Sequence, residues 1–130
     1  MITAFYAGLL ALVFLVLSAR VIWLRRKGIY LGDGGDPQMQ RAIRGHANFA
    51  EYVPLTLVLM LILDLAQTSG AILHALGITL LVGRLLHGYA LSFTQKFFFG
   101  RFWGTVLTFA ALGAAAILCI QRGVGMLALV

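Results

Sequence analysis

Four long apolar stretches, separated by short polar segments, dominate the chain. They cover about residues 2–23, 37–64, 71–93 and 102–120. Each is long enough for a helix that crosses the hydrocarbon core of a bilayer, which takes about 20 residues. The pattern therefore predicts an all-α membrane protein, with a single domain over residues 1–130 folded as a four-transmembrane-helix bundle.

Composition and charge agree with this pattern. Of the 130 residues, 62% are hydrophobic and 11% are charged, whereas soluble domains contain about 25% charged residues. Cations gather in two of the polar segments, with Arg25, Arg26 and Lys27 in the first and Lys96 and Arg101 in the second. Basic loops mark the cytoplasmic side, which puts both termini on the opposite side. The net charge of +6 therefore reflects membrane topology and does not indicate nucleic-acid binding.

The first polar segment is typical of a turn-rich connector. Its GDGGD sequence lacks the Lys and Ser/Thr of a phosphate-binding loop and the alternation of a calcium loop. Asp36 followed by Pro37 predicts a helix start with Asp36 as the N-cap. Cys119 has no partner cysteine and no metal-ligand spacing around it, so we expect neither a disulfide nor a metal site. The small residues 113–116 predict close helix approach in the last stretch.

A polar stripe crosses the second stretch at membrane depth. Arg44, Asn48 and Glu51 are spaced by four and then three positions, which places them on one helix face, with Arg41 and Tyr52 beside them. An ionisable group at bilayer depth costs about 2.5–3.5 kcal/mol and faces a protein interior or a cavity. The stripe is therefore a candidate binding site. The alternative is that Arg44 and Glu51 only neutralise each other or pair with a neighbouring helix.

The third stretch contributes further polar groups. Arg84 lies at about the same depth as Glu51, so we expect a contact between them, within one chain or between chains. His87 is interpreted as a packed or hydrogen-bonded residue. Because four helices are few to enclose a polar stripe, we expect a neighbouring subunit to complete the site.

With these residues identified, the chain resembles the MAPEG family, the membrane-associated proteins of eicosanoid and glutathione metabolism, and in particular its small bacterial inner-membrane branch. The resemblance covers essentially the whole chain and is carried by the signature R-x-x-R-x-x-x-N-x-x-E, at Arg41, Arg44, Asn48 and Glu51. It implies a homotrimer that binds glutathione as a co-substrate between adjacent subunits, near the cytoplasmic face. The candidate glutathione-binding residues are Arg41, Arg44, His46, Asn48, Glu51, Tyr52, Arg84 and Tyr89.

The resemblance also implies catalytic cations. Lys96 matches the arginine with which the conjugating enzymes of the family activate the thiol, and Arg26 falls near a basic position seen in those enzymes. A cation near the sulfur lowers the pKa of a thiol and raises the fraction of nucleophilic thiolate. An electrophile dissolved in the lipid could then reach the sulfur sideways.

Glutathione chemistry fits the polar stripe. The tripeptide has two carboxylates, an ammonium group and a thiol, and arginine binds carboxylates in a bidentate manner. We therefore expect a membrane-bound glutathione transferase or peroxidase that acts on hydrophobic electrophiles or lipid hydroperoxides. Two alternatives stay open. One is a non-catalytic member of the family that binds a lipid or a partner protein, and the other is a small efflux or ion-handling protein that uses Glu51 as a proton carrier.

Overall fold

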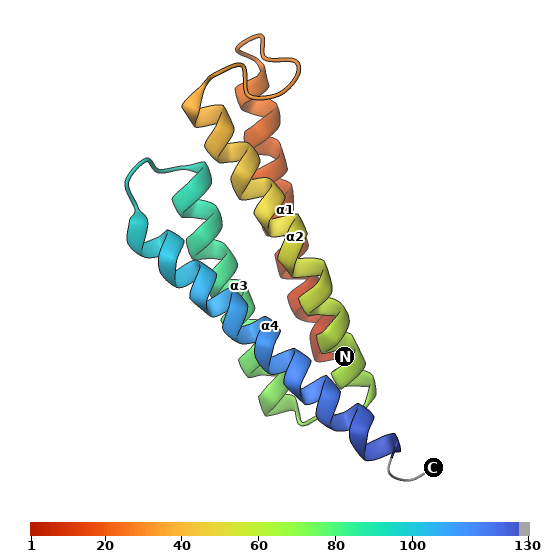
Figure 1. Cartoon of the computed structure of the whole chain (residues 1–130). Coiled ribbons are helices and arrows are strands. Elements are labelled where there is room, and N and C mark those ends of the chain that lie inside the picture. The colour runs from red at the N-terminus through yellow and green to blue at the C-terminus, as the bar shows by residue number, and fades with distance from the viewer. Residues whose placement is uncertain (128–130) are drawn as a thin grey trace.

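The computed structural model describes residues 1–127 and consists of four helices (Figure 1). They are α1 (Ile2–Arg25), α2 (Pro37–Leu65), α3 (Gly70–Ser92) and α4 (Phe98–Leu127). All four are long and apolar enough to cross a membrane. The predicted all-helical fold with four spans is confirmed.

The fourth helix departs most from its predicted bounds. It begins at Phe98 rather than near residue 102, and it continues past residue 120. A charged residue does not end a helix at a membrane surface, because a long cationic side chain can reach water while its stem stays on apolar surface. As a result Arg101, which the sequence placed in a loop, is held on a rigid helix.

The helices form two antiparallel pairs, α1 with α2 and α3 with α4 (Figure 1). α2 and α3 lie in the middle, because each of them contacts the other three helices. α1 and α4 make no contact with each other in residues 1–127, so they occupy opposite edges. The α1–α2 and α3–α4 loops lie at the same end of the bundle, which we call the loop end (Figure 1).

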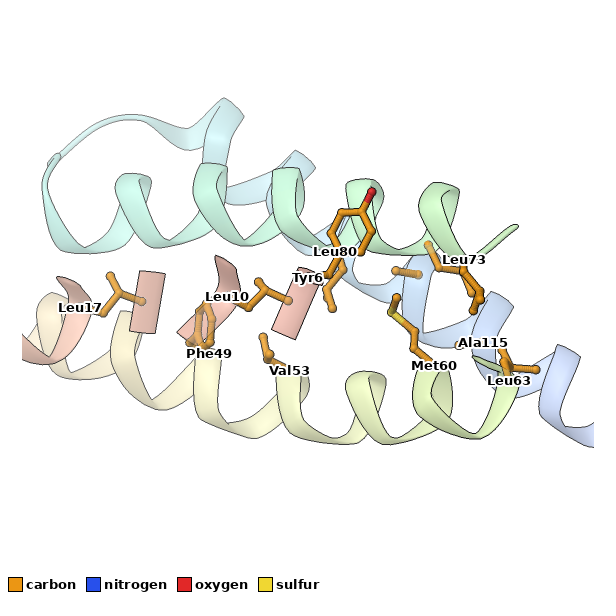
Figure 2. Packing of buried hydrophobic residues seen from close by; sticks show 12 residues of the cluster. Tyr6, Leu10, Leu17, Phe49, Val53, Met60, Leu63, Leu73, Leu80 and Ala115 are labelled. Atoms are coloured by element: carbon orange, nitrogen blue, oxygen red, sulfur yellow. The ribbon is translucent and has the colours of Figure 1, made fainter. Parts of the chain in front are cut away.

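A core of apolar side chains fills the space between the helices (Figure 2). α1 and α2 supply most of it, α3 adds leucines, and α4 adds small alanines. Such packing holds membrane helices together through van der Waals contact, since lipid provides no hydrophobic drive between them. The buried residues of this core are Tyr6, Leu10, Leu17, Phe49, Val53, Met60, Leu63, Leu73, Leu76, Leu80, Ala111 and Ala115.

α3 and α4 approach each other closely at two glycines. A Cβ atom on Gly104 would lie 2.7 Å from the backbone oxygen of Gly83 and 2.7 Å from the backbone nitrogen of His87. Only glycine fits there, because neither backbone atom can move aside. Within the run at residues 113–116, expected to make a close approach, Ala115 is buried in the core. Positions 113 and 114 are exposed, and a Cβ on Gly113 would meet nothing outside the local backbone of α4 within 4 Å.

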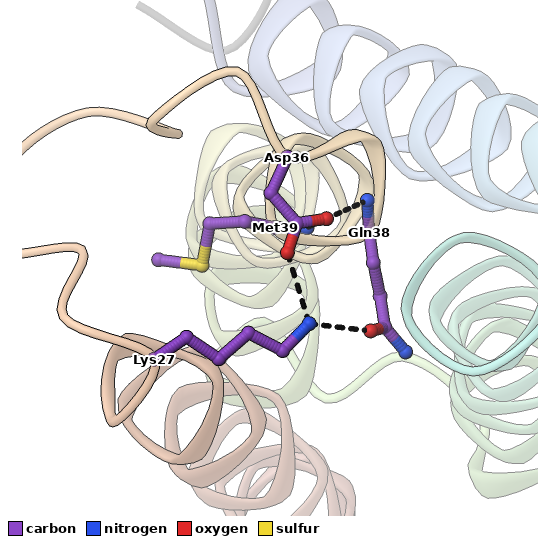
Figure 3. A network of polar contacts seen from close by, with 4 residues as sticks. All are labelled: Lys27, Asp36, Gln38 and Met39. Carbon is purple, nitrogen blue, oxygen red and sulfur yellow. Dashed lines mark hydrogen bonds and ion pairs between the residues drawn. The ribbon is translucent and has the colours of Figure 1, made fainter.

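The α1–α2 loop is fixed by polar contacts at the start of α2 (Figure 3). Asp36 is the N-cap, as predicted: its Oδ1 accepts hydrogen bonds from the backbone N–H groups of Gln38, at 2.7 Å, and Met39, at 3.4 Å. Lys27 Nζ donates to Asp36 Oδ2 at 2.9 Å and to Gln38 Oε1 at 3.1 Å. These contacts lower the pKa of the Asp36 carboxyl, the Lys27 hydrogen bond most strongly.

Candidate anion-binding cavity

A polar cavity of about 240 Å³ opens near the loop end of the bundle. Three helices build it. The N-terminal part of α2, the last two turns of α3 and the first turn of α4 contribute the lining. Helical spacing places the α2 contributors on one face, and positions 84, 87 and 91 share a face of α3 in the same way. The residues that line the cavity are Gln40, Arg41, Arg44, Asn48, His87, Leu91 and Arg101.

Positive charge dominates the lining. Arg41, Arg44 and Arg101 face the cavity, and no carboxylate lines it. The one ion pair found in the described part of the chain, between Lys27 and Asp36, belongs to the loop. A cleft lined by charges of one sign concentrates ions of the opposite sign. The cavity is therefore suited to an anion.

Arg84 lies behind this lining. It is only 1% exposed, and its Nη2 donates a hydrogen bond of 3.1 Å to Asn48 Oδ1. Its guanidinium carbon lies 5.8 Å from the centroid of the Phe49 ring, within the range of a cation–π contact. The predicted contact between Arg84 and Glu51 is not formed within the chain, because Glu51 is exposed on the outer side of α2.

His87 is the deepest titratable group of the cavity wall. It is 4% exposed, and its Nδ1 is sealed from solvent without a hydrogen-bond partner. A buried nitrogen without a partner is unusual and calls for an explanation. His87 is thus a polar group of the cavity wall that the described part of the chain leaves without a partner.

Several predicted site residues lie elsewhere. His46 Nε2 bonds with Ser18 Oγ at 3.1 Å, and its ring stacks on Phe14 at 4.6 Å, so it joins α2 to α1. Tyr52 packs against Phe109 at 5.3 Å. The predicted residues that lie exposed and outside the cavity lining are Arg26, Glu51, Tyr89 and Lys96.

The structure thus brings together part of the predicted site. Arg41, Arg44 and Asn48 share the cavity, while Arg101, predicted in a loop, and His87, interpreted as a packed or hydrogen-bonded residue, join them. The face shared by positions 84, 87 and 91 was a readable signal for His87. Arg101 had no such signal, because the sequence alone assigned it to a loop.

The fold and the cavity define an integral membrane protein with four spanning helices and a cationic cavity at one end. The model of the MAPEG family matches residues 3–121, and the chain belongs to this family. The resemblance inferred from the α2 signature is confirmed.

Two similar proteins are named as inner membrane proteins. The chain is 40% identical to inner membrane protein YecN of Escherichia coli K12 over 113 residues, which cover 86% of this chain and 85% of that protein. YecN of Escherichia coli O6:H1 matches with the same identity and coverage. No solved structure matches the chain.

Proposed function

We propose that this protein is a glutathione transferase or peroxidase of the inner membrane that acts on hydrophobic electrophiles or lipid hydroperoxides. The single observation that carries the proposal is the cavity lined by Arg41, Arg44 and Arg101 without a carboxylate. Membership of the MAPEG family and the inner-membrane name of a 40% identical relative support it.

The cavity wall offers what the anionic groups of glutathione require. Arg41 and Arg44 would bind the two carboxylates, because guanidinium groups pair with carboxylates through two parallel hydrogen bonds. Arg101 would face the sulfur, since it alone among the cationic residues outside α2 lines the cavity. A guanidinium there stabilises the thiolate form and so raises the nucleophile concentration at neutral pH. In this proposal Arg101 takes the role in place of Lys96 and Arg26, which do not line the cavity.

An apolar hollow of about 430 Å³ adjoins this position on the outer face of α4. Its lining includes Phe98, Phe102 and Phe109, and Arg101 is common to the hollow and to the cationic cavity. A hydrophobic substrate that lies in the hollow would meet the sulfur at Arg101. This arrangement favours an electrophile that reaches the site from the lipid.

The proposal includes a homotrimer with its basic loops in the cytoplasm. Glu51 is exposed near the middle of α2, and an unpaired ionised group at the centre of a spanning helix costs about 2.5–3.5 kcal/mol. A second copy that covers this face would remove Glu51 from lipid and place its carboxylate near the ammonium group of a bound tripeptide. The site would then lie between subunits.

Calorimetric titration of glutathione into the detergent-solubilised protein tests the proposal. We expect binding, with a thiolate absorbance on complex formation. Arg101→Met should weaken binding about 10-fold to 100-fold, because a hydrogen bond to a charged group contributes about 1.5–3 kcal/mol. Lys96→Met, which also removes one cation near the start of α4, is the matched control and should bind as the wild type does.

Activity and subunit number complete the test. Conjugation of a chloronitrobenzene and reduction of an organic hydroperoxide should both be measured against the uncatalysed rate. Binding without either activity would favour a non-catalytic member of the family. Absence of binding in the wild type would overturn the proposal, and native mass spectrometry that shows a monomer would overturn the trimer.

A further inference from the structure

The side-chain amide of Asn48 is held in one orientation by a residue that lies behind the cavity wall. Asn48 lines the cavity, and its only side-chain hydrogen bond within residues 1–127 is the one at 3.1 Å with Arg84 Nη2. Arginine carries donors and no acceptor. The atom of Asn48 that faces Arg84 must therefore be Oδ1, which leaves the Nδ2 amino group on the cavity side with both hydrogens free.

Arg84 is itself held in place by burial. Its side chain is 1% exposed, the Phe49 ring lies under its guanidinium carbon at 5.8 Å, and its Nε has no hydrogen-bond partner. No carboxylate approaches it within the described part of the chain. A buried guanidinium without a counter-ion destabilises a fold, so its presence here needs another reason.

We propose that Arg84 is a positioning residue that locks the Asn48 amide as a donor, so that Asn48 presents only its amino group to the carboxylates of the ligand. This inference rests on the proposed function for the identity of the ligand. With Oδ1 occupied, Nδ2 adds to the donors of Arg41, Arg44 and Arg101, and no acceptor of Asn48 meets the bound anion. We call this hydrogen bond from Arg84 to Asn48 Oδ1 the lock. It favours carboxylates of the ligand over groups that donate hydrogen bonds.

Asn48 is the only asparagine in the chain, so labelling with 15N-asparagine gives one side-chain amide signal pair. This signal reports the lock without any ligand. In Arg84→Met the pair should shift, and its hydrogens should exchange faster with water, because Oδ1 loses its charged donor. Arg122→Met, on the exposed far part of α4, is the matched control and should leave the pair in place. An unmoved pair in Arg84→Met overturns the inference.

A double-mutant cycle tests whether Arg84 acts through Asn48. Asn48→Ala and Arg84→Met should each weaken glutathione binding about tenfold, and the double variant should bind no more weakly than Asn48→Ala. Additive losses would mean that Arg84 acts on the ligand independently, which overturns the lock. Arg84→Met should stay folded, because replacing a buried ion with an apolar side chain of similar size is often neutral or stabilising.

Asn48→Asp separates the donor role from simple space filling. Aspartate has the size of asparagine, pairs with Arg84, and presents a negative oxygen where Nδ2 stood. Binding should therefore fall further than in Asn48→Ala, and wild-type affinity in Asn48→Asp would overturn the inference. Because the amide signal needs no glutathione, a wild-type protein that fails to bind overturns the proposed function and leaves the lock to be decided by that signal.

Discussion

The two ends of the bundle differ in how far their polar groups find hydrogen-bond partners within the chain. At the end away from the loops, Thr3 N–H donates to Asp64 Oδ2 at 2.8 Å and its hydroxyl donates to the Met60 carbonyl at 3.1 Å, while Tyr6 Oη bonds with His74 Nδ1 at 2.9 Å. These groups join α1 to α2 and α3. They satisfy one another within a single chain.

At the loop end, polar groups outnumber their partners. Three guanidinium groups line one cavity, and His87 Nδ1, Arg84 Nε and Ser92 Oγ are buried without hydrogen bonds, whereas at the other end Thr68 Oγ1 alone is so among the described residues. Such atoms are costly in a low-dielectric interior. The comparison teaches that polar residues at membrane depth serve structure where they pair with each other, and point to a ligand where they converge on a cavity unpaired.

The largest expected effect comes from separating α3 and α4 beneath the cavity. In Gly104→Leu the new side chain meets the Gly83 oxygen and the His87 backbone, and overpacking of this kind costs about 1–3 kcal/mol or more. The helices should move apart, and Arg101 should move away from the part of the cavity wall that α3 supplies. Thermal unfolding in detergent should show a lower Tm, and glutathione binding should fall more than tenfold.

Gly113→Leu is the matched control for this prediction. It lies on the same helix, and a Cβ atom added at Gly113 would have no other atom within 4 Å. Glycine is also about 0.8–1 kcal/mol less favourable than alanine in a helix, and leucine ranks close to alanine. Stability and binding should be unchanged or improved. An equal loss in both variants would show that the close contact at Gly104 is not what holds the cavity together.

A smaller effect is expected at the opposite end. Tyr6→Phe removes the hydrogen bond to His74 and keeps the ring in the core, where Tyr6 is 4% exposed. The loss should be about 0.5–1.5 kcal/mol of stability, measured as a modest decrease in Tm. Glutathione affinity should stay at the wild-type value. A large loss of affinity in Tyr6→Phe would remove the division between a structural end and a binding end.

The smallest effect concerns pH and the α1–α2 loop. The pKa of Asp36 is lowered in the fold, chiefly by the Lys27 hydrogen bond and then by the Gln38 N–H group. Its stabilising contribution is therefore present above the ordinary carboxyl pKa of about 3.9 and is lost as the pH falls through the lowered value. Once corrected for the intrinsic pH dependence of exchange, the protection of the Gln38 and Met39 amide hydrogens should fall over that range.

Asp36→Asn provides the comparison for the pH experiment. Its amide can still cap α2 but cannot change charge, so the pH dependence of exchange at the start of α2 should flatten. A profile identical to that of the wild type would assign the effect to another group. Glutathione binding at neutral pH should be unaffected, because Asp36 does not line the cavity.

The sequence by itself determined most features that lie within one helix, although it placed the ends of α4 too far inward. Apolar length fixed four spans, Asp36 before Pro37 fixed the start of α2, and helical periodicity put Arg41, Arg44 and Asn48 near one another. These features depend on 3.6 residues per turn and on backbone capping, which are local properties.

Tertiary structure alone decided which helices share the site. Only the packing of α3 on α4 through Gly83 and Gly104 brings Arg101 to the cavity. The rotation of α3 about its own axis decides that Arg84 bonds with Asn48 and not with Glu51. Periodicity fixes the angles between side chains on one helix, but the rotation and depth of that helix against its neighbours depend on how their surfaces interlock. That interlocking is a property of residue pairs far apart in the chain.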